Sequence, residues 1–294
     1  MSGAGIAAIE AAPVPPSAQR RTAAGPGPGL VVAGVVLAFV ALAALWPDLL
    51  TTRAPDAIEP VQALSGPSAE HWFGTDQLGR DIYSRIVDGA RPSLEIGVGA
   101  TVIAVAAGSI LGVVAATAGR VADELIMRIT DVFLAFPGLI LAMVLVAVLG
   151  PGTGNAMLAI SCSLTPGFVR LARGQALVVR EADYVRMAIV FGRSRWSAYR
   201  THLLPNTMPP LLVLATVNIG TAILAGSALS FLGLGPKDSS SEWGSMLSEG
   251  RDYLGSAWAT AVFPGLAISV TVVAINVVGR GLRQRFDGRS TDGD

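Results

Sequence analysis

The sequence predicts an all-α membrane protein with six transmembrane helices and one charged helical loop between the fourth and the fifth. Three observations support this fold class. The chain of 294 residues is 52% hydrophobic and 14% charged, with a mean hydropathy of +0.57, which is too apolar for an ordinary soluble domain. Its apolar residues form runs long enough to cross about 30 Å of hydrocarbon. Its arginines are concentrated in alternate connections between these runs.

The N-terminal part combines a polar tail with the first span. Residues 1–28 are rich in Ala, Pro and Gly and have no apolar period, which predicts a disordered tail. Residues 29–46 are the first uninterrupted apolar run, and Trp46 closes it with a side chain suited to the membrane interface. A cleaved signal peptide is the alternative, but the run is long for one and starts far from the N-terminus.

The connection 47–91 carries seven acidic residues and four arginines, and we expect it to be external. Its second half is dense in residues that form turns and hydrogen bonds, which a simple linker does not need. This density predicts an ordered loop in which Asp and Arg side chains pair with one another. The residues that carry the pattern are Gly74, Thr75, Asp76, Gly79, Arg80, Asp81, Ser84 and Arg85.

A core of five membrane helices is predicted over residues 92–280. Its first helix, the second span of the chain, is predicted at 93–118. Gly108 and Gly112 lie one turn apart in this run and leave a small face on which another helix can pack closely.

The third span is predicted at 129–149, after a short charged turn over 120–128. Pro137 lies within the span and predicts a kink, because proline interrupts the hydrogen-bond ladder of a helix. Asp131 lies near the inner end of the span, and we expect it to form a local ion pair with Arg128.

Three further apolar runs complete the core. Pro166 is expected to break the fourth span, while Asn218 and Asn276 are uncharged polar groups within the last two. These spans are predicted at 155–176, 211–234 and 256–278, with a tight external turn at 150–154, a polar external segment at 235–255 and a basic cytoplasmic tail at 281–294.

The charged loop, residues 180–206, holds the densest group of arginines in the chain. Apolar residues recur at helical spacing on both sides of Gly192, which predicts two short helices joined by a glycine with positive φ. Pro205 is expected to end the second helix. An amphipathic loop between membrane spans is suited to docking a partner. The residues expected to form the docking surface are Tyr184, Arg186, Met187, Ala188, Gly192, Trp196, Leu204 and Pro205.

Charge asymmetry sets the predicted orientation. With both termini inside, fifteen basic residues lie in inner segments and six in outer ones, and the outer loops hold most of the acidic residues. The positive-inside rule therefore places both termini and residues 180–206 in the cytoplasm, and the connections 47–91 and 235–255 outside.

The sequence lacks the residues that an enzyme or a metal site would require. The one lysine, Lys237, follows Pro236, so it forms no Walker phosphate loop. His71 and His202 fall on opposite sides of the predicted membrane, and the one cysteine, Cys162, is expected to be a small buried apolar residue. We expect no catalytic residue, no metal and no cofactor in this chain. Its net charge of zero gives no field for nucleic acid.

The signature between Gly74 and Arg85 resembles a known family pattern. It matches the GTDxxGRDxxSR sequence of the permease subunits of dipeptide, oligopeptide and nickel importers at all eight defined positions. The FLGLG at 231–235 and the EWG at 242–244 are similar to the same permeases.

The charged loop resembles the cytoplasmic coupling loop of ABC importer permeases. That pattern is Glu-Ala-Ala, three residues, Gly, nine residues, Ile-x-Leu-Pro, and Gly192, Leu204 and Pro205 fall on it with the expected spacing. The match departs at the triplet, which falls on residues 186–188 and keeps only one alanine, and at the Ile, which falls on His202.

This resemblance covers residues 29–285 and implies the type I permease fold of an ABC importer in a bacterial cell membrane. It also implies a homologous permease partner, two nucleotide-binding ATPase subunits docked at the charged loop, and an extracytoplasmic solute-binding protein. ATP and Mg²⁺ would then bind to the ATPase subunits, and the cargo would be dipeptides or oligopeptides. The alternatives are a permease for nickel or another small solute, and a secondary transporter, which would be expected to carry ionisable groups at mid-membrane.

Overall fold

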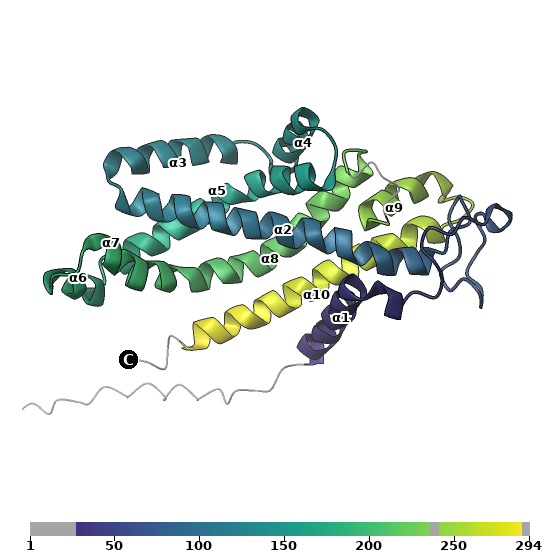
Figure 1. The fold of residues 1–294 in the computed structure, drawn as a ribbon, viewed down its shortest axis with the longest axis horizontal. Coiled ribbons are helices and arrows are strands. Elements are labelled where there is room, and N and C mark those ends of the chain that lie inside the picture. The colour runs from purple at the N-terminus through teal and green to yellow at the C-terminus, as the bar shows by residue number, and fades with distance from the viewer. Residues whose placement is uncertain (1–27, 236–240, 290–294) are drawn as a thin grey trace, which may run out of the picture.

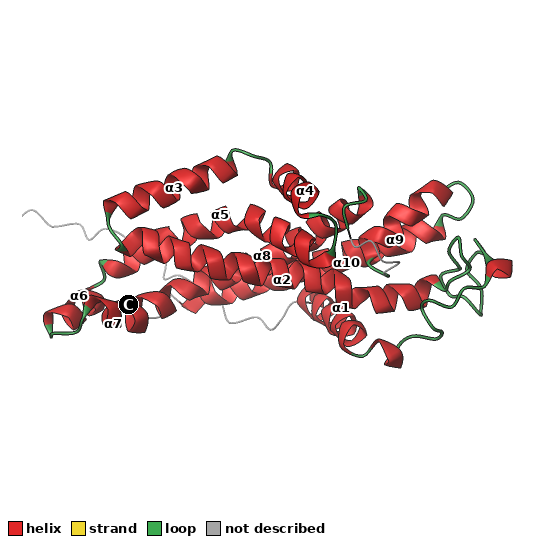
Figure 2. Cartoon of the chain, turned by 45° about the horizontal axis from the view of Figure 1, so that its top comes forward, coloured by secondary structure: helices red, strands yellow, loops and turns green. Residues whose placement is uncertain are grey.

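The structure is a computed structural model that describes residues 28–235 and 241–289 (Figure 1). Within these ranges the chain consists of helices, turns and loops, with one isolated antiparallel bridge between Thr75 and Asp81 (Figure 2). The predicted all-α class is confirmed. Three parts of the predictions lie outside the described residues: the tail over 1–27, the segment 236–240 with Lys237, and the end of the basic tail at 290–294.

Ten α-helices are assigned in the described ranges. They are α1 (Pro28–Leu45), α2 (Ile82–Thr117), α3 (Arg120–Leu134), α4 (Gly138–Leu149), α5 (Thr153–Arg180), α6 (Asp183–Val190), α7 (Arg195–Ala198), α8 (Leu204–Phe231), α9 (Trp243–Gly250) and α10 (Ala259–Arg289). Short 3₁₀ turns lie at Pro47–Leu49, Pro60–Gln62 and Arg251–Tyr253, and a π turn at Tyr199–Leu203 joins α7 to α8.

Four long helices form an elongated bundle. α2 packs along α5 and α8, and α10 packs on α8, while α1 lies against α10 and α2 (Figure 1). The shorter helices α3 and α4 cover one side of α5. One end of the bundle carries α6 and α7, and the opposite end carries the connection after α1 together with α9 (Figures 1 and 2).

The described helices are consistent with a polytopic membrane protein. Four helical segments are long and apolar enough to cross a membrane, namely α1, α2, residues 195–231 and α10 as far as Gly281, and the bent pair of α3 and α4 makes a fifth if it counts as one span. α5 contains Arg170 and Arg173 and lies beside α2 along the bundle. The six predicted spans therefore correspond to α1, α2, α3 with α4, α5, α8 and α10.

Small residues allow the central helices to pack closely. A Cβ atom at Gly108 would overlap the side chain of Phe168, and one at Gly112 would overlap the side chain of Ala172. α2 and α5 can approach each other this closely because both positions are glycine. The small packing face predicted on the second span is confirmed, and its partner is the fourth span.

The third span departs from its prediction. Residues 120–128, predicted as a turn, begin α3, and α3 meets α4 at 93° instead of forming one kinked helix. Pro137 has no N–H to donate to the carbonyl of Phe133, so the helix stops and the chain turns. α4 has 12 residues and is therefore about 18 Å long, too short to cross a membrane alone.

The ion pair predicted between Asp131 and Arg128 is wrong. Asp131 Oδ1 accepts a hydrogen bond from Arg170 Nη2 at 2.6 Å, and Asp123 is paired with Arg173 by two hydrogen bonds. Arg128 bonds instead to a glutamate one turn earlier on α3. Both aspartates thus tie α3 to α5, because tertiary packing supplied partners that lie far away in the sequence.

Two predictions in α5 are also wrong. Pro166 does not break the helix, which is continuous from Thr153 to Arg180 with Pro166 buried inside it. A proline removes one ladder hydrogen bond, and the packing of α5 along α2 holds the helix together on either side of it. Cys162 is exposed instead of buried. In a membrane protein an apolar residue can face lipid as well as the core. The apolar residues around Cys162 in the sequence therefore do not predict that it is buried.

Helix boundaries differ from their predictions at three other places. α2 begins at Ile82, inside the connection predicted to be a loop as far as residue 91. The second helix of the charged loop does not end at Pro205, because residues 195–231 form one continuous helical segment. α10 extends to Arg289, so the start of the predicted basic tail is helical.

Candidate functional sites at the two ends of the bundle

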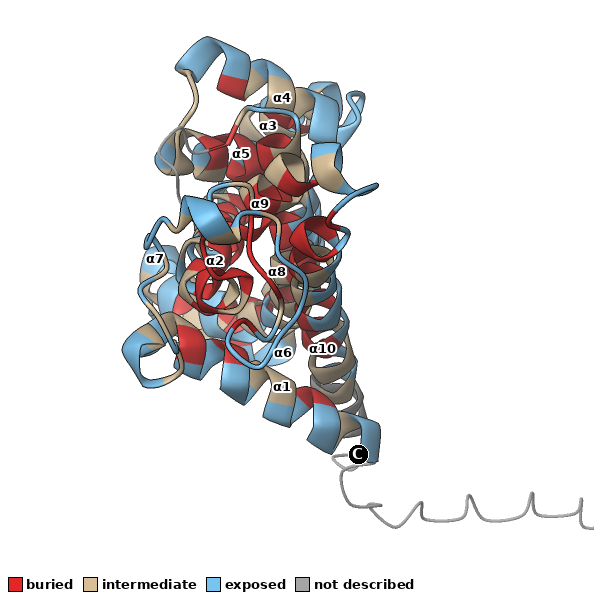
Figure 3. Cartoon of the chain, turned by 90° about the vertical axis from the view of Figure 1, so that its right-hand side faces the viewer, coloured by how far each residue is buried: buried red, intermediate tan, exposed pale blue. Residues whose placement is uncertain are grey.

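The eight signature residues are all buried, six in the connection after α1 and two in the first turn of α2. Figure 3 views the bundle from the end where α2 begins and shows buried segments among exposed loops. The eight residues meet in one network of turns and ion pairs. We call this set the signature knot: Gly74, Thr75, Asp76, Gly79, Arg80, Asp81, Ser84 and Arg85.

Asp76 is the centre of the signature knot. Its Oδ2 atom accepts hydrogen bonds from Arg80 Nε and Arg85 Nη1, both at 2.6 Å. Its Oδ1 atom accepts the backbone N–H groups of Leu78 at 2.8 Å and Arg80 at 3.0 Å. One carboxylate therefore fixes a turn and two guanidinium groups, and the predicted pairing of Asp with Arg is confirmed.

Glu249 on α9 completes the charge balance of the signature knot. Its Oε2 atom accepts hydrogen bonds from Gln77 Nε2 at 3.0 Å and Arg80 Nη2 at 3.1 Å, and lies 3.4 Å from Arg85 Nη1. Two arginines thus face two carboxylates, as burial of charge requires. Sequence reasoning missed Glu249, because it lies 164 residues from Arg85 and no local pattern links them.

Asp81 joins the connection after α1 to the first turn of α2. Its Oδ2 atom accepts the N–H of Ser84 at 2.8 Å, which caps the helix, and its Oδ1 atom lies 2.9 Å from His71 Nδ1. The other ring nitrogen of His71 lies 2.5 Å from Gln62 Oε1, and the hydroxyl of Thr75 donates to the carbonyl of Gln62. These contacts hold the loop against the start of the helix.

The backbone conformation at the two glycines of the signature knot favours glycine over other residues. Gly74 has φ +80° and Gly79 has φ +77°, a region that other residues rarely adopt. A Cβ at Gly74 would also crowd the carbonyl of Ser65, and one at Gly79 would overlap the backbone of Glu59.

The charged loop lies at the opposite end of the bundle (Figure 1). α6 ends before Gly192, whose φ of +89° confirms the predicted turn between two short helices. Ser194 then caps α7 by accepting the N–H of Ser197 at 3.3 Å. The glycine and the cap together fix the angle between α6 and α7.

The inner face of the charged loop is anchored to the bundle. Val185 and Leu203 are fully buried and pack in one cluster with Ala176 and Val179 of α5, and Ala198 is fully buried as well. These contacts hold α6, α7 and the π turn in a fixed position relative to the long helices.

The outer face of the charged loop is exposed. Of the eight predicted docking residues, Ala188 is half-buried and the other seven are exposed. Trp196 is 76% exposed, and Phe191 beside the turn is 82% exposed. Large apolar side chains exposed on one short loop are typical of an interaction surface. We call the exposed apolar set the docking face: Tyr184, Met187, Val190, Phe191 and Trp196.

Leu204 and Pro205 lie where the charged loop enters α8. The N–H of Leu204 bonds to the carbonyl of Tyr199, five residues earlier, in the π turn. Pro205 follows in the first turn of α8, a position that proline tolerates. Leu204 and Pro205 therefore continue the helix and make the charged loop and α8 one rigid segment.

The described residues contain no group of three or more His, Cys, Asp or Glu side chains placed to hold a metal ion. His71 bonds to Asp81 of the signature knot, and His202 lies beside Tyr184 in the charged loop with ring centroids 6.1 Å apart. The two histidines thus lie at opposite ends of the bundle.

Comparison with known proteins identifies similar chains. Residues 108–292 match the family model described as binding-protein-dependent transport system inner membrane component. The chain is 44% identical over 263 residues to the "Probable D,D-dipeptide transport system permease protein DdpC" of Escherichia coli K12, covering 90% of this chain and 88% of that protein. It is 43% identical to the dipeptide transport system permease protein DppC of Alkalihalophilus pseudofirmus, covering 87% and 84%.

A third relative and one solved structure extend the comparison. The chain is 39% identical to the glutathione transport system permease protein GsiD of Pectobacterium atrosepticum, covering 87% of this chain and 86% of that protein. Its fold is similar to a chain of the MetNI methionine ABC transporter in an inward-facing conformation, with a TM-score of 0.56 at 18% identity. That likeness covers 68% of this chain and 95% of the other.

Proposed function

Since the chain belongs to the family of binding-protein-dependent transport system inner membrane components, we propose that it is a permease subunit of an ATP-driven ABC importer of peptides. Relatives named for dipeptide and glutathione transport support peptides over nickel as the cargo class. The chain forms half of the translocation pathway, and a homologous permease forms the other half.

The docking face is the main structural support for the proposed coupling to ATPase subunits. It is apolar, exposed and fixed in position by the buried residues behind it, which are the properties of a surface built to seat in a partner's cleft. The two nucleotide-binding ATPase subunits dock here and bind ATP and Mg²⁺. Arg186 lies at the rim of this face, 65% exposed and 3.6 Å from Glu181.

The continuous helix from the charged loop into α8 supplies a route for force. Residues 195–231 form one helical segment, so a displacement of α7 by the ATPase subunits moves the inner half of α8 with it. Rigid movement of packed helices is a recognised form of domain rearrangement, and here it opens the pathway alternately to each side of the membrane.

The signature knot lies at the other end of the bundle, on the external side of the membrane, where the cargo is delivered. An extracytoplasmic solute-binding protein docks on this side. Both termini and residues 180–206 lie in the cytoplasm of a bacterial cell, as the arginine asymmetry requires.

Co-purification tests the proposed function. The chain is expressed together with the homologous permease and the ATPase subunits of its transport system and purified in mild detergent. We expect ATP hydrolysis in the complex and none in the chain alone, and peptide uptake only when the solute-binding protein is added. Hydrolysis that follows the isolated polypeptide through a final column would contradict the proposal.

Thiol labelling tests the orientation. A cysteine placed at Ser197, in α7, should resist an impermeant maleimide in intact cells and react after the membrane is opened. A cysteine at Glu59, in the connection after α1, is the matched control and should react in intact cells. Strong labelling at Ser197 in intact cells would contradict the proposed cytoplasmic location of the charged loop.

A further inference from the structure

The connection after α1 exposes apolar side chains at the end of the bundle farthest from α6 and α7 (Figures 1 and 3). Val61 is fully exposed, and Ile58 and Leu78 are exposed as well. The backbone of Glu59 packs so closely on Gly79 that a Cβ atom at Gly79 would overlap it. The segment with Ile58 and Val61 therefore lies next to the one with Leu78. We call these three residues the external patch: Ile58, Val61 and Leu78.

Contacts with buried residues fix the position of the external patch. The 3₁₀ turn at Pro60–Gln62 carries Val61, and the hydroxyl of Thr75 donates a hydrogen bond to the carbonyl of Gln62. The side chain of Gln62 also contacts His71, with its Oε1 atom 2.5 Å from the Nε2 atom of the ring. Thr75 and His71 are both buried. The turn is therefore held directly against the signature knot.

Leu64 follows this turn in a conformation that leucine rarely adopts. Its φ is +56°, and it is the one residue other than glycine with positive φ in the part of the chain that the structure describes. Its N–H donates to the carbonyl of Asp76 at 2.9 Å, and the N–H of Ser65 donates to Thr75 Oγ1 at 2.9 Å. Strained backbone held by surrounding contacts is common at functional sites. A surface fixed in this way loses little conformational freedom when a partner binds.

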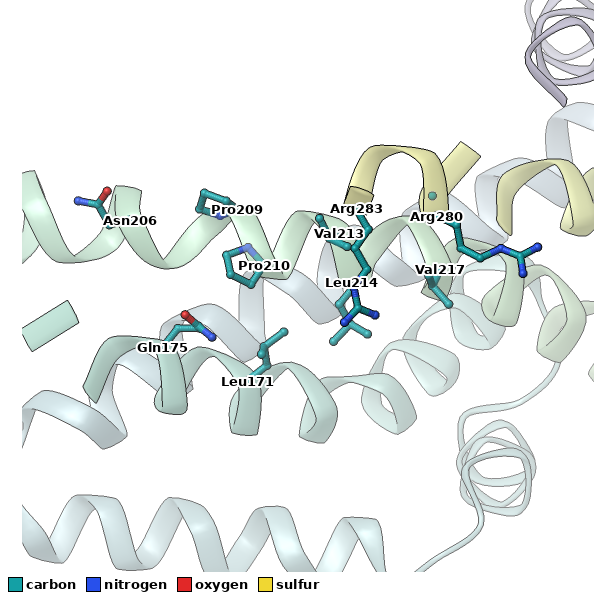
Figure 4. Close-up of a pocket in the computed structure, with 11 residues that line it drawn as sticks. Leu171, Gln175, Asn206, Pro209, Pro210, Val213, Leu214, Val217, Arg280 and Arg283 are labelled. Atoms are coloured by element: carbon teal, nitrogen blue, oxygen red, sulfur yellow. The ribbon is translucent and has the colours of Figure 1, made fainter. Parts of the chain in front are cut away.

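The shape of the external patch fits a protein better than a small solute. Small molecules bind in concave sites. A groove of about 740 Å³ lies between α5, α8 and α10 near the charged loop, and the external patch contributes nothing to its lining (Figure 4). Val61 is exposed over its whole side chain and projects from the molecule, so a partner must supply the hollow. Exposed apolar side chains on a rigid support are typical of protein–protein contacts.

Acidic residues surround the external patch in the sequence. Residues 53–72 contain Asp56, Glu59 and Glu70 and one arginine, Arg53. Arg53 pairs with Glu59 at 3.4 Å, whereas Asp56 and Glu70 are exposed and form no ion pair with any residue that the structure describes. A segment that lies on a bilayer typically carries lysine or arginine beside its apolar residues. The acidic surroundings therefore favour a protein partner with basic residues around an apolar hollow.

We propose that the external patch is the surface on which the extracytoplasmic solute-binding protein docks, an inference that rests on the proposed function and deepens it. Val61 enters an apolar hollow of that protein, and Asp56 and Glu70 face its lysine or arginine side chains. Asp81 of the signature knot caps α2. The knot thus connects the docked protein to the start of a central helix.

A fluorescent label at Val61 tests whether the solute-binding protein covers the patch. Val61→Cys is made in a Cys162→Ser background, labelled with NBD and studied in the complete transporter in nanodiscs of phosphatidylglycerol and phosphatidylcholine. We expect emission typical of water, which shifts to the blue when the purified solute-binding protein of the same transport system is added. Val148→Cys on α4, also highly exposed in the chain alone, is the matched control and should not respond to that addition.

Substitutions test the apolar and the acidic parts of the surface. Val61→Lys should weaken the affinity for the solute-binding protein about tenfold, because an ammonium group is costly to bury in an apolar hollow. Val61→Leu should retain the affinity, and both variants should keep the wild-type unfolding temperature because the side chain is fully exposed. Asp56→Lys should slow association about threefold at low salt, and high salt should remove the difference.

Three results would overturn the proposal: no response of the label at Val61, an unchanged affinity of Val61→Lys, or an association rate that Asp56→Lys leaves unchanged at low salt. A label already shifted to the blue before the addition would also overturn it. Quenching by nitroxide lipids would then assign the patch to the bilayer, and no quenching would assign it to the homologous permease.

Peptide uptake by the wild-type transporter separates this inference from the proposed function. If uptake depends on the solute-binding protein while the label and the variants show no effect, the proposed function holds and docking at the patch is wrong. If uptake does not depend on that protein, the proposed function fails and the docking proposal fails with it.

Discussion

The two ends of the molecule carry motifs with opposite burial. All eight residues of the signature knot are buried, whereas seven of the eight predicted docking residues of the charged loop are exposed. The two arginines of the knot pair with Asp76 and with Glu249 of α9, while the docking face presents apolar side chains that the described chain leaves uncovered.

This difference explains why one motif matches its family pattern fully and the other does not. A buried charge without its partner costs several kcal/mol, so each member of the signature knot constrains the others. An exposed side chain is constrained mainly by its partner protein, and substitutions there are compensated on the other side of the interface. Burial therefore constrains the signature more tightly than it constrains the charged loop.

The largest effect is expected from breaking the centre of the signature knot. Asp76→Ala leaves Arg80 and Arg85 buried without their shared carboxylate, which should cost about 3 to 5 kcal/mol of folding free energy. The variant should fall sharply in membrane level and in thermal unfolding temperature in detergent. Glu59→Ala, which removes a half-exposed pair with Arg53, is the control and should cost less than about 1 kcal/mol. Equal melting of the two variants would refute the buried network.

Substitutions at Gly79 and Gly192 distinguish the effect of backbone strain from the effect of steric crowding. Gly79 and Gly192 both have positive φ, but a Cβ at Gly79 would overlap the backbone of Glu59, while nothing lies within 4 Å of one at Gly192. Gly79→Ala should therefore prevent normal folding. Gly192→Ala should add about 1 to 2 kcal/mol of strain and re-aim α7, so import falls while membrane level stays near normal.

Folding and uptake of both glycine variants decide this prediction, with Gly174→Ala as the control. Gly174 lies inside α5 with open space around it, so alanine should be tolerated there. The comparison fails if Gly192→Ala imports peptides at the wild-type rate with its ATPase bound.

Truncating the docking face should affect assembly and leave folding unchanged. Trp196→Ala removes a side chain that is 76% exposed, and we expect about 2 kcal/mol, or about a thirtyfold weakening, of ATPase affinity with an unchanged unfolding temperature. Val148→Ala on α4, at a position 80% exposed, is the control and should leave ATPase binding intact. Affinity is measured by titration of the ATPase subunits onto the purified chain.

The smallest effect is expected at the edge of the signature knot. Glu249→Gln removes one charge from a side chain that is one third exposed, so solvent compensates part of the loss and we expect about 1 kcal/mol of destabilisation. Glu95→Gln removes an exposed partner of Arg91 and should change the unfolding temperature less. If Glu249→Gln proved as unstable as Asp76→Ala, Glu249 would contribute as much as Asp76 to the stability of the network, which contradicts the prediction.

The helical class, the positions of the long apolar runs and both motifs could be predicted from the amino-acid sequence. These features depend on local chemistry: hydropathy over a span, the positive φ at Gly192, and the pairing of Asp76 with Arg80 four residues away. Each is fixed by residues close together in the chain, so a reading of composition and spacing can find it.

The remaining features could not be predicted, because they depend on which segments, distant in the sequence, pack against one another. Glu249 contacts the signature knot because of the way α9 packs, and Asp131 pairs with Arg170 because α3 lies along α5. Prolines had different outcomes for the same reason: Pro166 sits in a helix supported by α2, whereas at Pro137 the chain turns by 93°. A proline removes the same hydrogen bond in each case, and the surrounding packing determines whether the helix continues.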